Sequence, residues 1–393
     1  DKKIGIYDDT FENLTLTPAS ATSYNIQDSN GMNLGGNLTI NTNATLNTTT
    51  SNYTLTVAGG VSGAGTLTTN ASEVSLGYLI MSGTYNATTH ANGTILTDRS
   101  GPSAQLLMDA ADIVHNDGLF VFKGSSGGSS YCALNGASDA TNGLYNVEID
   151  ASSRTVNVSV YNLTIHNNLT VTAGTFNTTS DDWALTVGAA LDVGGSGALT
   201  CNSSTVQCNG LRSQGGTVNL PDADGGLTIK GTEFSGYGIH DTSGSGNLVH
   251  NNGTVTWDIG GLSTMNAKST FYNITTATSG TDLRWFGTLT LAGALTVAAN
   301  TDVFEHASAG GNLTITGAVS VSGKLGNSDA YSAYEFGSLT IESGGEYHAT
   351  DGTTTIKDGN FDNSGTFTHN NGKVTFQVHD KYINNSGTVE PVF

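Results

Sequence analysis

Three pairs of aspartates are the carboxylates whose spacing could support catalysis. They are Asp181 with Asp182, Asp222 with Asp224, and Asp358 with Asp362. Glycoside hydrolysis needs two carboxylates that converge on one cleft. Neighbouring residues of a strand point to opposite faces, so Asp181 and Asp182 would not converge in an extended chain. Pro221 and the glycines that follow place the second pair in a turn. We therefore predict solvated loop carboxylates and no enzyme.

The turn at 221–226 is also the one candidate metal site. Asp222 and Asp224 carry carboxylate oxygens, the ligands that Ca²⁺ prefers. Arg212 and Lys230 flank the turn, so a lyase that uses a basic residue to remove a proton from an acidic sugar would use the same place. The turn does not complete a calcium-loop motif. We expect no resident cofactor, with calcium at Asp222 and Asp224 as the exception that the sequence allows.

A histidine-led phrase occurs three times and tempts a metal-binding or catalytic interpretation. It reads HNDGLFVF from His115, HNNGTVTW from His250 and HNNGKVTF from His369. An active site is normally unique, whereas a turn can recur in every repeat, and Asx-Gly is a tight-turn signal. We predict a structural turn in each copy. Its nine defining residues are His115, Asn116, Gly118, His250, Asn251, Gly253, His369, Asn370 and Gly372.

The three cysteines allow at most one disulfide within the chain. Cys201 and Cys208 are close enough in sequence to bridge neighbouring strands, which leaves Cys132 over. Buried free thiols are the alternative. The cysteines lack the Cys-x-x-Cys spacing and clustered histidines of a zinc site, so we expect no metal there.

Sequons of the form Asn-x-Ser/Thr are numerous. In a secreted protein from a glycosylating host they would be candidates for glycans, and the four that we single out are Asn13, Asn43, Asn86 and Asn273. A chain this rich in Asn and Thr also makes many sequons by chance, so their occupancy stays open.

The elements that must position these residues are short strands. The tetrapeptide Asn-Leu-Thr-Ile occurs at 37–40, 162–165 and 312–315, and Leu-Thr followed by Val or Ile recurs elsewhere. Each copy alternates apolar and hydroxyl side chains with a period of two, and Thr, Val and Ile favour strands. Gly, Asn or Ser bound most copies and supply tight turns. Helical periodicity is almost absent; residues 104–113 are the one candidate and could equally form a strand.

Repetition on a longer scale decides the fold class. The histidine phrase closes repeat units over 1–122, 123–257 and 258–376, and residues 377–393 start a fourth. Repeats that cannot bury a face alone must stack. We predict an all-β chain that forms one right-handed parallel β-solenoid, with coils of roughly 20 residues and a rod on the order of 80–100 Å long. Tandem β-sandwich domains are the runner-up, but they predict clear linkers and tryptophans at fixed positions, which are hard to find here.

Composition and charge limit the partners. Only 12% of the 393 residues are charged, 36% are apolar, and the formal net charge is −20. This balance, without a basic stripe, disfavours nucleic acid and anionic membranes, because phosphate binding needs clustered Lys and Arg. The longest apolar runs are too short to span a bilayer. The chain begins at Asp1 without a signal-peptide pattern, which predicts a processed form or a segment of a longer protein.

Two segments combine both kinds of repeat, residues 337–345 (GSLTIESGG) and 365–376 (GTFTHNNGKVTF). They resemble the Gly/Thr/Asn-rich β-solenoid repeat regions of secreted surface proteins and phage fibres, of the type found in marine bacteria and their viruses. The resemblance spans most of the chain at the level of composition and repeats. It implies a structural or adhesive role outside the cytoplasm and identifies no catalytic residue.

We therefore expect a non-catalytic extracellular structural protein, a β-solenoid that self-assembles into or forms part of a surface filament, sheath or adhesive appendage. Tyr382-Ile383 and Val392-Phe393 look like a pairing surface, which predicts a homo-oligomer or filament at a cell or virion surface. Surface glycans are further expected partners. The alternatives are a phage tail fibre, spike or capsid-decorating adhesin, and a polysaccharide-binding or polysaccharide-cleaving β-helix enzyme.

Overall fold

The computed structural model of the chain is a parallel β-solenoid of about 16 turns. It describes residues 1–5, 11–97, 103–124, 128–136, 139–242, 247–266, 268–277, 280–306, 311–327 and 332–390. The strand ladders between adjacent coils run parallel, from the first coils to the last. The predicted parallel solenoid is therefore confirmed. The β-sandwich alternative is wrong, because its sheets are built from antiparallel strands.

The described residues divide into two compact units, and each is taken by itself below. The first is Asp1–Gly188 with Val193–Thr200, and the second is Ala189–Asp192 with Cys201–Phe393. Strand β22 (Ala190–Thr200) contributes residues to both. The long repeat units over 1–122, 123–257 and 258–376, with 377–393 after them, are similarities of sequence and stay a prediction. Val392 and Phe393 lie outside the described residues.

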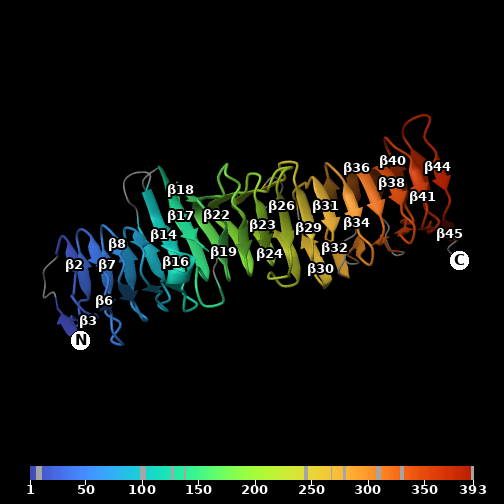
Figure 1. Cartoon of the computed structure of the whole chain (residues 1–393). Helices are drawn as coiled ribbons and strands as arrows, with labels where there is room; N and C mark the ends of the chain where they lie inside the picture. The colour runs from blue at the N-terminus through green and yellow to red at the C-terminus, as the bar shows by residue number, and fades with distance from the viewer. Residues whose placement is uncertain are drawn as a thin grey trace. The chain divides into compact units, whose positions relative to one another are not determined.

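In the first unit each early coil supplies three strands, and the strands of adjacent coils lie side by side (Figure 1). The first column is β2 (Leu14–Leu16), β5 (Leu38–Ile40), β8 (Val61–Gly63), β11 (Leu79–Met81), β14 (Ser103–Asp109) and β17 (Gly128–Asn135). The second column is β1 (Lys2–Ile4), β3 (Thr22–Ile26), β6 (Ala44–Asn47), β9 (Thr66–Thr68), β12 (Tyr85–Asn86) and β15 (Ile113–Val114). The third column is β4 (Met32–Leu34), β7 (Leu55–Val57), β10 (Val74–Leu76), β13 (Thr94–Leu96) and β16 (Leu119–Lys123).

Longer strands follow in the same unit. The first half of β18 (Asn146–Val158) pairs with β16 and its second half with β17, so one strand continues two columns. Next to it lies β20 (Leu169–Asn177). A separate pair is formed by β19 (Leu163–Ile165) and β21 (Leu185–Val187).

The second unit is built in the same way. One column is β23 (Thr205–Cys208), β26 (Gly226–Ile229), β29 (Thr254–Trp257), β31 (Asn273–Thr276) and β34 (Leu295–Val297), continued by the second halves of β36 (Leu313–Val321) and β38 (Tyr334–Ile341) and by β41 (Phe361–Asn363) and β44 (Ile383–Asn385). Another is β24 (Gly210–Gln214), β27 (Tyr237–Asp241), β30 (Gly261–Asn266), β32 (Thr281–Trp285), β35 (Asp302–Glu305), β37 (Lys324–Leu325), β39 (Glu346–His348), β42 (Thr366–Thr368) and β45 (Thr388–Glu390).

The third column of the second unit starts with β33 (Leu289–Leu291). It goes on through the first halves of β36 and β38 to β40 (Thr353–Ile356) and β43 (Lys373–Phe376). A short pair, β25 (Thr217–Asn219) with β28 (Leu248–Val249), completes the unit.

The repeated tetrapeptides form the core because strand side chains alternate between two faces. In β5, Leu38 and Ile40 are fully buried, whereas Thr39 between them is only half-buried. The register places Leu14 beside Leu38 and Thr15 beside Thr39. A repeat in the sequence therefore becomes a ladder of like side chains in the structure.

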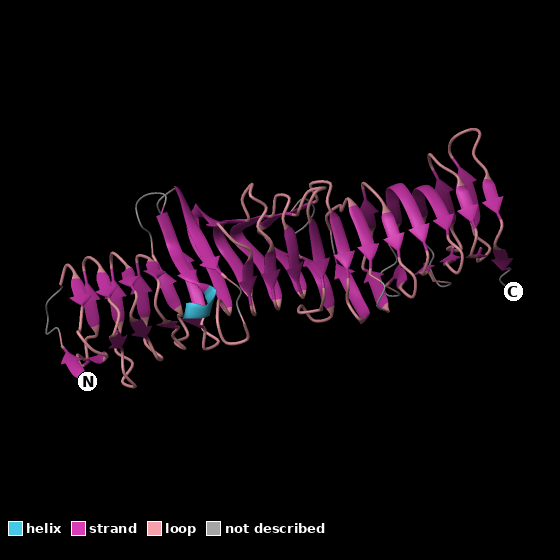
Figure 2. Ribbon diagram, in the orientation of Figure 1, coloured by secondary structure: helices cyan, strands magenta, loops and turns pink. Residues whose placement is uncertain are grey.

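The one helical candidate, residues 104–113, is mainly a strand. Its first part belongs to β14, which pairs with β17. A single 3-10 helix, η1 (Ala110–Asp112), follows, and the Asp109 carboxylate caps it by accepting from the Ala111 backbone N–H. Figure 2 shows it as the one helical turn among the described residues. None of the described helices has the length and apolar character needed to cross a membrane.

Trp257 on β29 is a large core residue of the second unit. It is fully buried, and its indole N–H donates to Ser263 Oγ at 2.7 Å. The neighbouring coil must pass close to the indole, since a Cβ at Gly238 would lie 2.8 Å from both Trp257 and Ile259. Glycine is therefore needed at position 238.

Trp257→Ala should lower the free energy of unfolding of the second unit by about 3–5 kcal/mol, because it leaves a large cavity in the core and removes the indole hydrogen bond to Ser263 Oγ. Chemical denaturation would measure the loss. Phe286→Ala is the control, since that ring is 41% exposed, and it should change stability by no more than about 0.5 kcal/mol. Equal losses in the two variants would contradict this placement of the core.

Candidate functional site

The three histidine phrases adopt one backbone geometry. In each, the closing glycine N–H donates to the histidine carbonyl, at 2.7 Å for Gly118, 2.9 Å for Gly253 and 2.8 Å for Gly372. The two central residues have positive φ in every copy, namely Asn116 (46°), Asp117 (56°), Asn251 (44°), Asn252 (64°), Asn370 (44°) and Asn371 (59°). Two successive positive φ angles define a type I′ turn, which Asn and Asp tolerate better than other non-glycine residues.

The histidine of each phrase stabilises its own turn. Its Nδ1 accepts the backbone N–H two residues on, at 2.9 Å in the His115 turn and 3.0 Å in the His250 and His369 turns. The Nε2 of His115 also contacts Ala140 O at 3.0 Å, and the ring is buried and stacks on Tyr145. These imidazoles are used within the structure, where they hold the turns closed.

The asparagine that follows each histidine joins adjacent coils. Asn116 Nδ2 donates to Ala87 O at 3.0 Å, Asn251 Nδ2 to Leu220 O at 2.9 Å, and Asn370 Nδ2 to Ala349 O at 2.7 Å. Each acceptor is a backbone carbonyl of the preceding coil. The phrase thus closes a turn and fastens it to its neighbour.

A related turn escaped the sequence comparison. In His90-Ala91-Asn92-Gly93, the Asn92 N–H donates to His90 Nδ1 at 3.2 Å and the Gly93 N–H to His90 O at 2.9 Å. In this turn the residue with positive φ is Gly93 (69°). The position after the histidine, where the other copies have Asn at positive φ, is occupied here by Ala91, and alanine adopts positive φ less readily than asparagine. The pattern His-x-Asn-Gly is the signal that would have found it.

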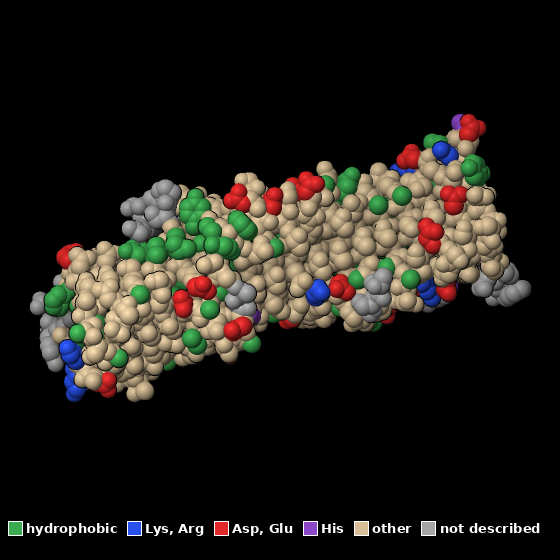
Figure 3. Space-filling view, in the orientation of Figure 1, with side chains coloured by type: hydrophobic (Ala, Val, Ile, Leu, Met, Phe, Trp, Pro, Cys, Tyr) green, Lys and Arg blue, Asp and Glu red, His purple; other side chains and the backbone are tan. Residues whose placement is uncertain are grey.

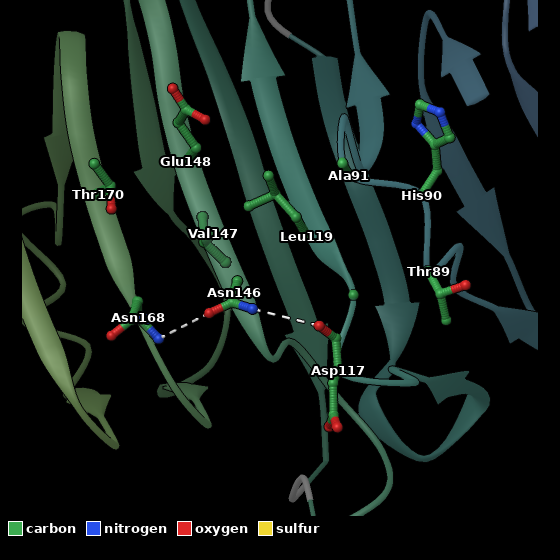
Figure 4. A pocket seen from close by; sticks show the side chains of 11 residues that line it. Thr89, His90, Ala91, Asp117, Leu119, Asn146, Val147, Glu148, Asn168 and Thr170 are labelled. Atoms are coloured by element: carbon green, nitrogen blue, oxygen red, sulfur yellow. Dashed lines mark hydrogen bonds between the residues drawn. The ribbon is translucent and has the colours of Figure 1, made fainter. Parts of the chain in front are cut away.

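A surface groove of about 450 Å³ in the first unit is a candidate binding site. Two of these turns border it through Thr89–Ala91 and Asp117–Leu119, and Asn146–Glu148, Asn168 and Thr170 complete it. Figure 4 shows the Asp117 and Glu148 carboxylates pointing to opposite ends of this lining. They do not form an acid–base pair across one cleft.

Amides hold the floor of this groove together. Asn146 Nδ2 donates to Asp117 O at 3.4 Å, and Asn146 Oδ1 accepts from the backbone N–H of Asn168 at 3.4 Å (Figure 4). Glu148 accepts from Thr172 Oγ1 at 3.4 Å. The lining offers donors and acceptors suited to a polar ligand, without a nucleophile placed beside a base.

The predicted calcium turn uses its carboxylates within the protein. One oxygen of Asp222 accepts from Ser203 Oγ at 2.8 Å and the other from the backbone N–H of Asp224 at 3.1 Å. Asp224 is exposed. Across the part of the chain that the structure describes, no group of three or more His, Cys, Asp or Glu side chains is arranged to hold a metal ion.

The two other aspartate pairs lie in separate surroundings. Asp181 and Asp182 are exposed in the turn before β21. Asp358 is exposed in the loop before β41, whereas Asp362 lies within that strand, in register with Thr340. Asp181, Asp182 and Asp358 are therefore exposed outside strands, as predicted, whereas the prediction of a solvated loop is wrong for Asp362, which is half-buried in a strand.

The predicted disulfide between Cys201 and Cys208 is not present in the structure. Both cysteines, and Cys132, are buried and form no disulfide. Burial raises the pKa of the Cys132 and Cys208 thiols to about 12 and that of Cys201 as well. All three cysteines are therefore apolar core residues. Buried thiols were the alternative to a disulfide in the sequence-based prediction.

The four singled-out sequons fall into two groups. Asn13 and Asn43 are exposed. Asn86 and Asn273 are half-buried, and their Nδ2 atoms donate to hydroxyls of the preceding coil, Thr68 at 3.1 Å and Thr254 at 3.3 Å. A glycan on Asn86 or Asn273 would be attached to the same Nδ2 atom that forms this hydrogen bond between two coils.

Sequence analysis missed a row of charges on the second unit. Asp282, Asp302, Lys324 and Glu346 lie in register on successive coils, and a groove of about 320 Å³ opens beside the last three. Partial burial, and then the Asp282 carboxylate, raise the pKa of Asp302, and Lys324 opposes this effect only in part. Their spacing of 20 and then 22 residues matches the coil length, which is the signal that could have found the row.

No protein-family model, curated protein or solved structure matches this chain.

Asn251→Ala should destabilise the second unit by about 1–2 kcal/mol, because it removes the hydrogen bond to Leu220 O and places an alanine at positive φ. Asn252→Gly should be close to neutral, since glycine adopts positive φ freely. Thermal denaturation of the two variants would measure this difference. A loss for Asn252→Gly as large as that for Asn251→Ala would contradict the role assigned to the first asparagine.

Asp302→Asn should raise the melting temperature at about pH 7 and lose this advantage as the solution is acidified. The folded-state pKa of Asp302 lies above its unfolded value, so its carboxyl favours folding at acid pH, and this contribution disappears as the pH rises through the folded-state pKa. Melting curves across the acid range would measure the effect. Asp351→Asn, at an exposed position, is the control; a pH-independent gain in Asp302→Asn would refute the electrostatic cause.

Proposed function

We propose that this chain is a non-catalytic extracellular structural protein, a β-solenoid that forms part of a surface filament, sheath or adhesive appendage. A β-solenoid fold suits a structural or adhesive role. The observation that carries the proposal is the use of the repeated polar side chains. They bond one coil to the next and do not converge on a reacting centre.

Asparagine ladders are the clearest case. Asn70 Nδ2 donates to Asn47 Oδ1 at 2.8 Å, and Asn177 Nδ2 donates to Asn157 Oδ1 at 2.9 Å, in both cases between adjacent coils. Amides stacked in this way bond along the coil axis. Such bonding stiffens the repeat and leaves these groups unavailable for catalysis.

Sequon-type asparagines add a second link. The Oδ1 atoms of Asn162, Asn273 and Asn312 accept the backbone N–H that precedes a strand of the next coil, at 2.9, 2.8 and 3.1 Å. In each of these three repeats, the asparagine side chain therefore makes the same bond to the next coil. Stability that builds up between nearest neighbours in this way is characteristic of solenoids.

The last described coil supports self-association. Ile383 continues the ladder of Leu339 and Phe361, and both of those residues are fully buried, yet Ile383 is 51% exposed. Val389 continues the ladder of Phe367 and is 48% exposed. Strands β44 and β45 each pair on one side only within the described residues. An open strand edge with exposed core residues is a surface on which another coil can stack.

The protein should form concentration-dependent polymers, seen by sedimentation velocity and by electron microscopy. Ile383→Asp should keep it monomeric at the same concentrations, because a carboxylate cannot be buried against a stacked coil. Leu262→Asp is the matched control: Leu262 is 52% exposed on β30, away from the last coil, so this variant should polymerise as the parent does. A parent protein that stays monomeric at high concentration, or an Ile383→Asp variant that polymerises equally well, would refute self-association through this coil.

A further inference from the structure

The second unit carries a cluster of planar side chains outside its core, which we call the aromatic platform. Its five members are Asp192, Arg212, Phe234, Tyr237 and His240. All five are partly exposed. On the face of the molecule in Figure 3, the backbone and side chains that are neither charged nor hydrophobic cover most of the surface, with smaller groups of hydrophobic side chains between them. Aromatic rings are therefore not needed to cover the outside of a coil, and their grouping requires an explanation.

An ion pair fixes the centre of the platform. Arg212 Nε donates to Asp192 Oδ1 at 2.9 Å, and Nη2 donates to the other oxygen of the same carboxylate. The guanidinium lies over the Phe234 ring, with Cζ at 4.6 Å from the ring centroid. A bidentate pair that also stacks on an aromatic ring is rigid and has a balanced charge.

The two aromatic rings are placed by extra residues in their coil. Arg212 and His240 are in register on adjacent coils and stand 28 positions apart, whereas 20 positions separate Thr264 from Arg284 and Arg284 from Phe304. The extra residues form a tight turn in which the Tyr237 N–H donates to Phe234 O at 3.1 Å. Insertions in solenoid coils commonly build the binding face.

The turn also departs from regular ladder geometry. Ser235 has a φ of 54° and Gly236 a φ of 91°. The ladder to the next coil is irregular between Tyr237 and Ile239. This interruption sets the turn apart from the regular rows of the neighbouring coils.

His240 completes the platform. Its ring lies parallel to Tyr237, with 4.6 Å between the centroids and 12° between the planes. Desolvation, and then the charge of Arg212, lower the pKa of His240, against a smaller opposing effect of Asp241. The imidazole is therefore neutral at physiological pH. A neutral imidazole offers one hydrogen-bond donor and one acceptor, and the Tyr237 hydroxyl offers both.

We propose that the aromatic platform binds a neutral polysaccharide. The parts of the Phe234 and Tyr237 rings that Arg212 and His240 leave exposed suit the apolar faces of sugar rings, and the polar groups of Arg212, Asp192 and His240 suit their hydroxyls. A neutral ligand fits because the Arg212–Asp192 pair has no net charge, whereas the chain carries −20 and would repel a polyanion. The proposal deepens the adhesive side of the proposed function by naming the chemical class of the partner.

Affinity electrophoresis and calorimetry with dextran, mannan and xylan, and with alginate as an acidic comparison, would test the proposal. The parent protein should bind at least one neutral polymer, with an affinity that hardly changes when salt is added. Tyr237→Ala and Phe234→Ala should each weaken this binding by about tenfold or more. Tyr161→Ala is the matched control, because it removes a tyrosine ring that is 39% exposed and belongs neither to the platform nor to the last described coil, and it should bind as the parent does.

Absence of binding to all three neutral polymers, or binding to alginate alone, would overturn the proposal. Equal binding by Tyr237→Ala, Phe234→Ala and Tyr161→Ala would place the site elsewhere and would overturn it as well. Melting curves would show that the variants are folded. Sedimentation of the same samples separates the two proposals, because a loss of glycan binding leaves polymer formation through the last coil unchanged.

Discussion

The in-register parallel ladder between coils is the interaction on which the rest of this structure depends. Adjacent strands lie about 4.8 Å apart, and each residue faces its counterpart one coil away. A buried leucine therefore stacks on a leucine, as Leu163 does on Leu185, and an outward threonine on a threonine, as Thr164 does on Thr186. Any residue that fits badly against its own repeat would disrupt two interfaces at once. This constraint explains why so few residue types are used so often.

The same ladder decides what the polar residues can do. Asn116, Asn251 and Asn370 each bind a carbonyl of the coil before them, and the histidines beside them close the turns. A polar side chain that already forms hydrogen bonds within the protein makes the coil rigid and does not react with a partner. Chemistry directed at a partner must come from positions where the ladder is interrupted. The inserted turn from Phe234 to Tyr237 and the irregular register after it are such a position.

Sequence reasoning succeeded where a short local pattern has one structural outcome. The alternation in Asn-Leu-Thr-Ile predicts strands, and its recurrence predicts stacked parallel coils, which the structure confirms. It was less informative where a pattern has two outcomes. Apolar and polar residues do not alternate regularly in residues 104–113, so this stretch was compatible with a helix or a strand. Its first part forms a strand, because it pairs with β17. Cys201 and Cys208 allowed either a disulfide or two thiols, and both side chains are buried in the core as free thiols.

The sequence by itself determined the fold class and the tight turns, because both follow from short-range preferences: period-two alternation, and the tolerance of Asn, Asp and Gly for positive φ. Only the tertiary structure decided which distant residues meet. Asp192 with Arg212, or Asp282 with Asp302, come together because coils of particular lengths place them in register, and a single inserted residue would separate them. Coil length is the sum of many loops whose conformations depend on packing against the neighbouring coil. For that reason the aromatic platform became visible only in the folded chain, and the regular spacing of the charge row gained its meaning once the coil length was known.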